Sequence, residues 1–416
     1  MNRASHQHSQ HIAVVGAGFA GLASAALLAR AGHAVTVFEK FATPQSIGAG
    51  ILIQPSGLAA MRVLGIADDI IARGGAVRHL FGVNHRQRPV LNLSYDAWQP
   101  GAFGLGLHRG VLFEALWRLC VKNGVKLVIG EEITELPALR SAFDLVVIAD
   151  GANSRLRAQT GLPFRDRLYP WGAVWAVLDD LRRHELDAAQ RDPRATLLQW
   201  VRGASEMLGI MPTGEAAGRS GKVVSLFWSL HEADYPAWRS AGLGAFKQQV
   251  LALNPSCAPF LEQIAHMEQL TWARYRDVSM PRYHTVATQS ADQPSAPCVV
   301  IGDAAHATSP QLGQGTNLAL LDAVTLADCI AQAPNLPAAL DAYTQTRKAH
   351  LHFYGQASRW MTPAFQSHQT ILPWLRDAFM AQSMQWPVVG AFCRQTLVGV
   401  RTSWVRPGGV LRLSSF

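Results

Sequence analysis

Residues 301–322, IGDAAHATSPQLGQGTNLALLD, are the stretch of this sequence that decides the fold. An apolar run ends in Gly302-Asp303, a turn rich in glycine and proline follows, and a helical pattern begins near Gly315. This order predicts a strand, a loop and a helix, with an acid at the end of the strand. The free N–H groups at the start of such a helix carry about half a positive charge, so the turn suits an anionic or electron-rich ligand.

A second glycine-rich turn, GAGFAG at residues 16–21, lies near the start of the chain. It follows a β-branched run at residues 11–15 and opens a helical pattern, and Glu39 ends the next strand-like run. A complete βαβ unit of this kind binds dinucleotides. Its three glycines fit a tight turn, a close approach of the backbone to pyrophosphate, and close packing of the helix on the strand. Two cofactor-facing turns far apart in the chain therefore predict one long ligand that joins them, FAD.

A third candidate turn is Asp150-Gly151, which follows the apolar run at residues 145–148. An Asp-Gly pair at the end of a strand can be a plain turn. Here Ser154 follows, with arginines one and three residues later, so this segment can place an N-cap and two guanidinium groups near a phosphate. Glu39 has the reach to bind ribose hydroxyls with its carboxylate oxygens. Lys40, directly after it, fits either a 2′-phosphate contact or an ordinary surface position.

The rest of the chain divides by its pattern. We expect helices at residues 57–73 and 109–122, and strands of a half-solvated sheet at residues 76–93. Residues 166–289 contain strand-like runs that carry many of the tryptophans, interrupted by a helical pattern at 244–253. The predicted fold is α/β: a Rossmann-like FAD-binding domain (1–75, 102–165 and 290–345), an inserted antiparallel β-sheet substrate domain (76–101 and 166–289), and a helical C-terminal segment (346–416).

Composition limits the possible functions. The chain has 416 residues, of which 49% are hydrophobic and 16% charged, so it can bury a large core. The net charge of +8 comes without a Lys/Arg block, which argues against nucleic-acid binding. The five cysteines are scattered, which predicts no metal site and reduced thiols in the cytoplasm. We expect no membrane contact, and a monomer or homodimer.

The three turns together resemble the single-component (group A) flavoprotein monooxygenases, the para-hydroxybenzoate hydroxylase-like family. The motifs GAGFAG, VVIADGANSRLR and VVIGDAAHATSPQLGQGTNLALLDA occur in that family's order, and residues 47–51 and 107–109 look like family elements. The resemblance is specific over residues 11–60, 104–160 and 297–345, and thin over 165–290. There is no second GxGxxG after a strand, which matches this family and argues against a separate nicotinamide domain.

The resemblance implies an FAD enzyme that takes electrons from NAD(P)H and hydroxylates a small, aromatic substrate with O₂ through a C4a-hydroperoxyflavin. Glu39 would bind the adenosine ribose, Arg109 the phosphates or ribityl chain, and Asp303 the ribityl or pyrophosphate region. The cofactor-binding candidates are Gly16, Gly18, Gly21, Glu39, Lys40, Arg109, Asp150, Gly151, Gly302, Asp303, Gly313, Gly315, Thr316 and Asn317. The loop expected under the isoalloxazine ring contains Pro310, Gly313, Gln314 and Gly315.

Two alternatives remain at this point: a flavin-dependent reductase or dehydrogenase of the same fold, and a flavin-binding redox sensor without turnover. No catalytic side chain is identified; the open candidates are Tyr169, Tyr275, Tyr283, His231 and His284. The tail carries Trp374, Phe379, Met384 and Trp386, with a helix expected to open at Pro373. We expect this tail to pack near the substrate cavity; the alternative is a patch that rests on a membrane surface, helped by Arg394, Arg401 and Arg406.

Overall fold

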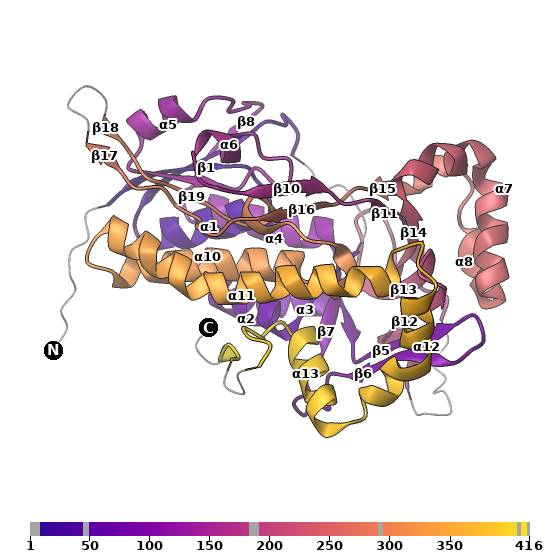
Figure 1. Ribbon diagram of the computed structural model, residues 1–416. Coiled ribbons are helices and arrows are strands. Elements are labelled where there is room, and N and C mark those ends of the chain that lie inside the picture. Colours follow the sequence, from indigo (N-terminus) through magenta and orange to yellow (C-terminus); the bar gives the residue numbers. More distant parts are fainter. Residues whose placement is uncertain (1–8, 45–49, 183–190, 290–293, 406–408, 414–416) are drawn as a thin grey trace.

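The computed structural model of this chain describes residues 9–44, 50–182, 191–289, 294–405 and 409–413. Residues 47–49 of the family resemblance and Arg406 of the tail lie outside these ranges. The described part is a mixed α/β structure with a parallel sheet, a separate and mainly antiparallel sheet, and helices at the C-terminal end (Figure 1). This agrees with the predicted fold class.

The parallel sheet has five strands in the order β19-β9-β1-β2-β8. All four neighbouring pairs are parallel. Its strands are short and nearly continuous in apolar residues, as strands covered on both faces are. Their bounds are β1 His11–Val15, β2 Ala34–Glu39, β8 Lys126–Ile129, β9 Leu145–Ile148 and β19 Cys298–Val300.

Helices cover both faces of this sheet, and Figure 1 shows α1, α10 and α11 stacked on one side and α5 and α6 on the other. The small residues of α1 are almost all buried, which lets this helix lie close to the sheet and to α10. The helices are α1 Phe19–Arg30, α4 Arg109–Lys122, α5 Leu136–Ala142, α6 Leu156–Gln159, α9 Asp303–His306, α10 Gly315–Gln332 and α11 Leu336–Phe365.

A three-stranded antiparallel sheet, β3-β7-β4, lies between the parallel sheet and the second large sheet. Its strands are β3 Gly50–Ile53, β4 Gly75–Val77 and β7 Gly104–His108. The expected single helix at residues 57–73 is wrong in one respect. It is two helices, α2 Pro55–Leu64 and α3 Ala67–Arg73, because Gly65 takes a left-handed conformation with φ +76° and ends α2.

The second large sheet has seven strands in the order β15-β11-β14-β13-β12-β5-β6. The β12–β5 pair is parallel and its other pairs are antiparallel. The helix expected at 244–253 is the second part of α7 Tyr235–Leu253, which is broken at Gly242, and α7 packs with α8 Ala258–Glu262 on one face of the sheet. The strands are β5 His79–Asn84, β6 Pro89–Ser94, β11 Trp171–Asp179, β12 Thr196–Arg202, β13 Glu206–Gly214, β14 Val223–His231 and β15 Thr271–Ala273.

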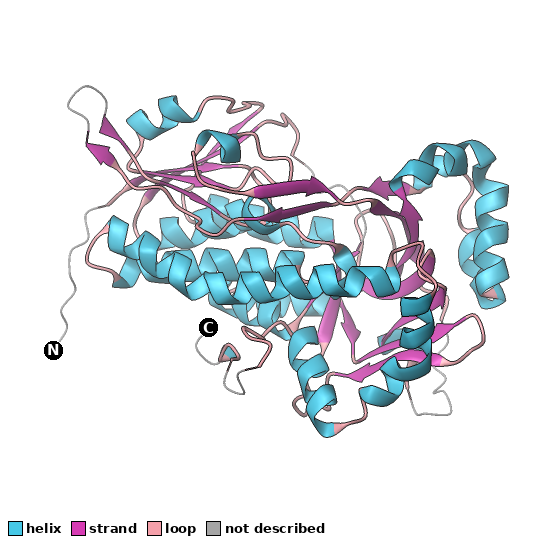
Figure 2. Ribbon diagram, viewed as in Figure 1, coloured by secondary structure: helices cyan, strands magenta, loops and turns pink. Residues whose placement is uncertain are grey.

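Short elements connect these layers. The two-stranded ribbon β10 Arg165–Leu168 with β16 Arg276–Ser279 runs from the parallel sheet toward the seven-stranded sheet, as Figure 2 shows. A second ribbon pairs β17 Thr288–Gln289 with β18 Pro294–Ser295. The 3₁₀ helices are η1 Pro193–Ala195, η2 Glu232–Asp234, η3 Pro255–Cys257, η4 Met267–Gln269 and η5 Pro310–Leu312.

The C-terminal helices bind the two large sheets together. The 30-residue helix α11 spans both, so the expected domain boundary at residue 345 falls inside it. Helix α12, Ile371–Ser383, begins two residues before Pro373, which was expected to open it, and packs against β6. In α12, α13 (Pro387–Leu397) and the turn between them, Met384 is buried, whereas Trp374, Phe379 and Trp386 are exposed. None of the described helices is long and apolar enough to cross a membrane.

Candidate functional site

Four of the predicted site segments follow the carboxyl ends of adjacent parallel strands. The last residue of β1, Val15, pairs with Phe38 of β2 and with Ile148 of β9, and Ile148 pairs in turn with Val300 of β19. The turns that begin with Gly16, Asp150 and Gly302 therefore leave one edge of the sheet side by side with Glu39. In open α/β sheets, ligands bind at this edge.

The GAGFAG turn is shaped by the absence of side chains. A Cβ on Gly16 would lie 2.4 Å from the Ala149 carbonyl oxygen, and one on Gly21 would lie 2.0 Å from the Gly16 carbonyl oxygen. Gly18 differs, because nothing lies within 4 Å of its Cβ position and the residue is exposed. Two glycines are needed for the chain to pack on itself, and the third leaves an open backbone surface that fits a pyrophosphate.

The Glu39 carboxylate is held beside this turn. Its Oε2 accepts a hydrogen bond from the Ala17 N–H at 2.8 Å, and its Oε1 accepts one from the Phe41 N–H at 3.1 Å. Each carboxylate oxygen can accept further hydrogen bonds. The half-buried carboxylate therefore has a fixed position next to the turn and capacity left for hydroxyl donors. Lys40 behaves differently: it is exposed, and its Nζ lies 5.0 Å from the centre of the Phe41 ring.

The Asp150-Gly151 turn carries a polar atom without a partner. Asp150 Oδ1 is buried and has no hydrogen bond among the described residues. Burial raises the pKa of Asp150, against the effect of a hydrogen bond from Ser154. A ligand that donates a hydrogen bond here would satisfy this oxygen. Gly151 follows with φ +83° and nothing within 4 Å of its Cβ position, so the backbone is open here too.

The arginines after this turn do not both face a phosphate. Arg157 is buried; it donates to the Ala304 carbonyl oxygen at 2.7 Å and pairs with Asp166. Arg155 is exposed and its guanidinium lies 3.8 Å from Glu132. Arg157 therefore ties the Asp150-Gly151 segment to α9 and β10, which is a structural role.

Asp303 and Gly315 face one another across the same edge. The Asp303 carboxylate is exposed, with no hydrogen bond or ion pair among the described residues, and a Cβ on Gly315 would lie 3.8 Å from its Oδ1. Arg109, also exposed, lies with its guanidinium carbon 5.4 Å from the centre of the Phe19 ring at the start of α1. The charged groups at this edge are thus open to a ligand.

The turn expected under the flavin ring is fixed by Asn317. Its Oδ1 accepts from the Gln54 N–H at 2.8 Å, and its Nδ2 donates to the Gly313 carbonyl oxygen at 2.9 Å. Gly313 itself takes φ +58°. Gln54 also accepts from the Tyr95 hydroxyl at 2.7 Å, a pair that the sequence analysis missed. The turn is therefore anchored to the end of β3.

Other members of this loop are placed less simply. The Gln314 side chain is buried: its Nε2 donates to the Leu397 carbonyl oxygen at 2.8 Å, and its Oε1 has no hydrogen-bond partner among the described residues. Pro310 begins η5, and Thr316 is half-buried in the first turn of α10. Ser56 N–H donates to the Val398 carbonyl oxygen at 3.2 Å, so the C-terminal segment packs directly behind the loop.

A cluster of neutral polar groups connects this loop to the seven-stranded sheet. Gln311 Nε2 donates to the Tyr169 hydroxyl at 2.7 Å and to Gln366 Oε1 at 2.6 Å. Gln366 Nε2 donates in turn to Ser229 Oγ at 2.8 Å. Burial raises the pKa of Tyr169, which keeps its hydroxyl neutral. Of these residues, the sequence analysis named only Tyr169 as a candidate.

A buried ionic network supports the Gly302 turn from below. Asp322 accepts from the Gly302 N–H at 2.8 Å, from His306 Nε2 at 2.5 Å and from Arg347 Nε at 2.7 Å. Burial alone would raise the pKa of Asp322, but His306 and Arg347 hold it well below its ordinary value.

The network continues to the C-terminal segment. Arg347 donates to His350 Nδ1 at 2.7 Å, and His350 Nε2 donates to the Gly399 carbonyl oxygen at 2.9 Å. Burial and the neighbouring Arg347 charge hold the pKa of His350 well below its ordinary value, so the ring is neutral. An acid inside an apolar helical run, at Asp322, was the sequence signal that could have revealed this network.

The open candidates separate into two groups. Tyr275 accepts from Trp175 Nε1 at 3.4 Å, and burial raises its pKa; His231 contacts Trp171 and His368 at the same side of the sheet. Tyr283 instead packs against Tyr343 in the main core, with ring centres 6.2 Å apart, and the buried His284 bonds to Thr344 at 2.8 Å. The last two have structural surroundings.

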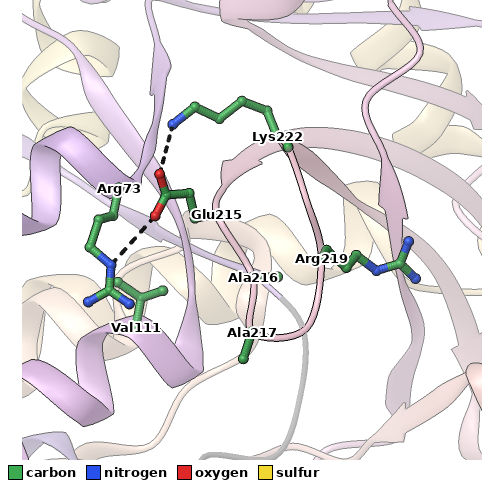
Figure 3. A pocket seen from close by; sticks show the side chains of 8 residues that line it. Arg73, Val111, Glu215, Ala216, Ala217, Arg219 and Lys222 are labelled. Atoms are coloured by element: carbon green, nitrogen blue, oxygen red, sulfur yellow. Dashed lines mark ion pairs between the residues drawn. The ribbon is translucent and has the colours of Figure 1, made fainter.

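A surface cavity of about 310 Å³ lies elsewhere, between α3, the start of α4 and the loop after β13. Figure 3 shows Arg73 and Lys222 reaching Glu215 from two sides, at 3.7 and 3.8 Å, while the Arg219 guanidinium points away from Glu215. Arg219 pairs with Asp179 at 2.7 Å. Because its cations are already paired, this cavity has no free charge for an anionic ligand. Among the described residues no group of three or more His, Cys, Asp or Glu could hold a metal ion.

The edge described above fits FAD: an open glycine backbone at Gly18, a fixed carboxylate at Glu39 and an orphaned oxygen at Asp150 lie at neighbouring strand ends, and Asn317 holds the turn at Gly313. Comparison with known proteins agrees. A family model described as "FAD binding domain" matches residues 9–113 and 257–355.

Individual proteins and solved structures are also similar to this chain. The chain is 30% identical over 346 residues to the 3-amino-4-hydroxybenzoate 2-monooxygenase of Streptomyces cremeus, covering 78% of this chain and 80% of that protein. It is 26% identical to the aurachin C monooxygenase/isomerase of Stigmatella aurantiaca, covering 89% and 93%. Klebsiella pneumoniae HpxO, solved with FAD and uric acid, has the same fold at a TM-score of 0.75 and 19% identity, covering 96% of this chain and 99% of that one.

Proposed function

Because this chain belongs to the family of FAD-dependent aromatic monooxygenases, we propose that it uses NAD(P)H and O₂ to hydroxylate a small aromatic molecule bound between the Gly313–Gly315 turn and the seven-stranded sheet. The observation that carries the proposal is the meeting of Gly16, Glu39, Asp150 and Gly302 at one edge of the parallel sheet. Kynurenine 3-monooxygenase of Salinispora arenicola, 28% identical over 386 residues, supports the choice of an aromatic substrate.

The protein's part in this reaction is binding, orientation and exclusion of water, since bound FAD supplies the electron transfer and the activation of O₂. Glu39 would accept hydrogen bonds from the ribose, and Asp150 would accept one through its orphaned oxygen. Asp303 and Arg109 would flank the phosphate and ribityl region. The backbone N–H groups of residues 313–317, at the start of α10, would stabilise negative charge on the flavin ring. Gly18, Gly151 and Thr316 would contribute backbone groups that face the cofactor. Lys40 would lie at the rim of the cofactor site.

The domain boundaries, the cellular compartment and the oligomeric state are also proposed. We place the FAD-binding domain at residues 1–75, 102–165 and 290–345, the substrate domain at 76–101 and 166–289, and the C-terminal helical segment at 346–416. The five free cysteines among the described residues support a reducing compartment, the cytoplasm. We expect a monomer or homodimer that binds neither nucleic acid nor membranes, which light scattering and vesicle sedimentation would check.

The function is tested by adding small aromatic molecules to the FAD-loaded protein and following NAD(P)H oxidation, O₂ consumption and peroxide release together. A monooxygenase shows oxidation that one class of aromatics stimulates, with less peroxide released than O₂ consumed. A reductase of the same fold would oxidise NAD(P)H without incorporating oxygen. A redox sensor would bind FAD and show no stimulation by any aromatic, which would contradict the proposal.

A further inference from the structure

The seven-stranded sheet presents different side chains on its two faces. Successive residues of a strand point to opposite faces. On β11, β13 and β14 the even-numbered apolar residues pack against α7, as Val174, Ile210 and Trp228 do. The odd-numbered residues 171–177, 207–213 and 223–231 therefore point away from α7. We call this side the odd face.

The odd face is turned toward the proposed flavin turn. Ser225 Oγ accepts from the Gly50 N–H of β3 at 2.8 Å, and Ser229 Oγ accepts from Gln366, which bonds Gln311 of the loop. Phe227 lies between these two serines on β14. The row of residues that crosses the sheet at Phe227 therefore lies between two hydrogen bonds, one to β3 and one to Gln366. Both β3 and Gln366 also contact the flavin-facing loop.

That row is aromatic at one end and carries two glycines toward the other. Strand pairing aligns Trp175, Phe227, Gly209, Gln199 and Gly82 across five strands. The rings of Trp175 and Phe227 are 5.0 Å apart, and the Phe227 ring covers the Cβ position of Gly209. Flat side chains beside two glycines form a surface suited to an aromatic ring.

Charge is missing from the described part of this surface around the row. On the described strands β11, β13, β14 and β15, the odd-numbered side chains are apolar, hydroxyl or thioether groups, except for His231 at one end of β14 and Asp179 at the end of β11, which pairs with Arg219. Two arginines near the face are already paired with acids. Arg359 makes two hydrogen bonds of 2.8 Å to Asp277, and Arg276 pairs with Asp166 at 2.7 Å.

Arg109 is the remaining cation that would give the odd face a charge. Its charge acts on Tyr275, lowering that tyrosine's pKa against the larger, raising effect of burial. However, the Arg109 guanidinium lies over Phe19, at the turn proposed for the cofactor's phosphates. Those phosphates would neutralise it. A carboxylate on the odd face would then lose its water without gaining a charged partner, which is costly.

Resting on the proposed function, we infer that the substrate is an uncharged aromatic molecule and not an aromatic acid. Its ring lies against Trp175 and Phe227, and its neutral polar group meets the amide and hydroxyl cluster of Gln311, Tyr169 and Gln366. Neutral side chains of this kind recognise carbonyl, amide or ring N–H groups without needing an opposite charge.

Matched pairs of ligands test this inference on the wild-type, FAD-loaded protein. We would compare 4-hydroxyquinoline with its 2-carboxylate, and 4-hydroxybenzamide with 4-hydroxybenzoate. Dissociation constants come from the change in the flavin absorbance spectrum, and turnover from NAD(P)H oxidation. We expect each neutral member to bind about tenfold more tightly than its acid, a difference of about 1.4 kcal/mol. Acids that bind as tightly as their neutral partners overturn the inference and leave the monooxygenase function intact. A protein whose NAD(P)H oxidation no aromatic changes overturns the proposed function itself.

A charge placed on the row sharpens the test. Gln199 is half-buried and belongs to the row, so Gln199→Arg places a guanidinium on the odd face. We expect this variant to reduce the preference for the neutral ligand by about tenfold. Gln249→Arg, on the exposed side of α7, adds the same charge behind the sheet and should leave the preference unchanged. A folded, flavin-loaded Gln199→Arg protein with the wild-type preference would contradict the inference.

Discussion

The edge of the parallel sheet and the odd face of the seven-stranded sheet hold their functional groups in opposite ways. At the edge, glycines bring the backbone itself to the surface, and charged side chains such as Asp303 and Arg109 are exposed. On the odd face, side chains form the functional surface: Trp175 and Phe227 provide aromatic rings, and Ser229 and Gln366 form a neutral hydrogen bond. Among the described residues, charge is thus concentrated where the cofactor's phosphates would lie, and the row where the substrate would lie has none.

The largest expected effect comes from a side chain placed inside the backbone-built edge. In Gly21→Ala the new Cβ meets the Gly16 carbonyl oxygen at 2.0 Å, so the turn must open. We expect the free energy of unfolding to fall by about 3 kcal/mol and FAD binding to be lost. Denaturant unfolding and flavin content measure both. The matched control, Gly244→Ala in α7, has nothing within 4 Å and should be neutral or stabilising. Equal stability of the two variants would show that the edge is not closely packed.

The contact between the C-terminal segment and the flavin-facing loop is the next to break. Gly399 has φ +88°, and a Cβ there would lie 2.0 Å from Ser56 Oγ and 3.0 Å from Gln314 Oε1. Gly399→Ala should cost about 2 kcal/mol of stability. Because the loop is displaced, peroxide release per NAD(P)H oxidised should rise. Unchanged peroxide release in a destabilised but flavin-loaded protein would make this contact purely structural.

Asp303→Ala separates cofactor binding from folding. The exposed carboxylate has no partner among the described residues, so the stability of the FAD-free protein should change by less than about 0.5 kcal/mol. FAD affinity should fall by about tenfold, because a carboxylate that meets the cofactor is lost. Flavin fluorescence titration gives the affinity. Asp328→Ala, on the far part of α10, serves as the control and should bind FAD normally.

A pH dependence of the stability is expected from the buried His350. Its pKa is held well below the ordinary value, so below about pH 6.5 the unfolded chain takes up a proton that the folded chain does not. The free energy of unfolding should therefore fall by about 1.4 kcal/mol between pH 7.5 and 5.5 from this group alone. His350→Gln should lack this component. Wild-type and variant curves of unfolding free energy against pH that run parallel would remove His350 as its source.

The cofactor edge could be predicted from the sequence because its chemistry demands particular residue types. Only glycine tolerates the approaches at Gly16 and Gly21, and an acid after a strand is visible in the sequence as Glu39 or Asp303. Parallel pairing then brings these strand ends together. The family resemblance and the fold class followed from the same residues.

The rest depended on contacts between distant segments. Gln311 meets Gln366, and Asp322 meets Arg347, through folding that no local pattern encodes. Gln314 lies in the expected loop, yet its side chain turns to Leu397. The odd face was equally hidden, since the alternation of a strand shows two faces without telling which one α7 covers.

The central claim is that this protein transfers an oxygen atom from O₂ to an aromatic ring, and isotope labelling tests it most directly. The FAD-loaded protein would be reacted with NAD(P)H, ¹⁸O₂ and the aromatic that stimulates NAD(P)H oxidation most, and the products analysed by mass spectrometry. We predict a hydroxylated product that carries one ¹⁸O atom per molecule. NAD(P)H oxidation with all of the consumed ¹⁸O₂ recovered as hydrogen peroxide, and no labelled aromatic product, would contradict it.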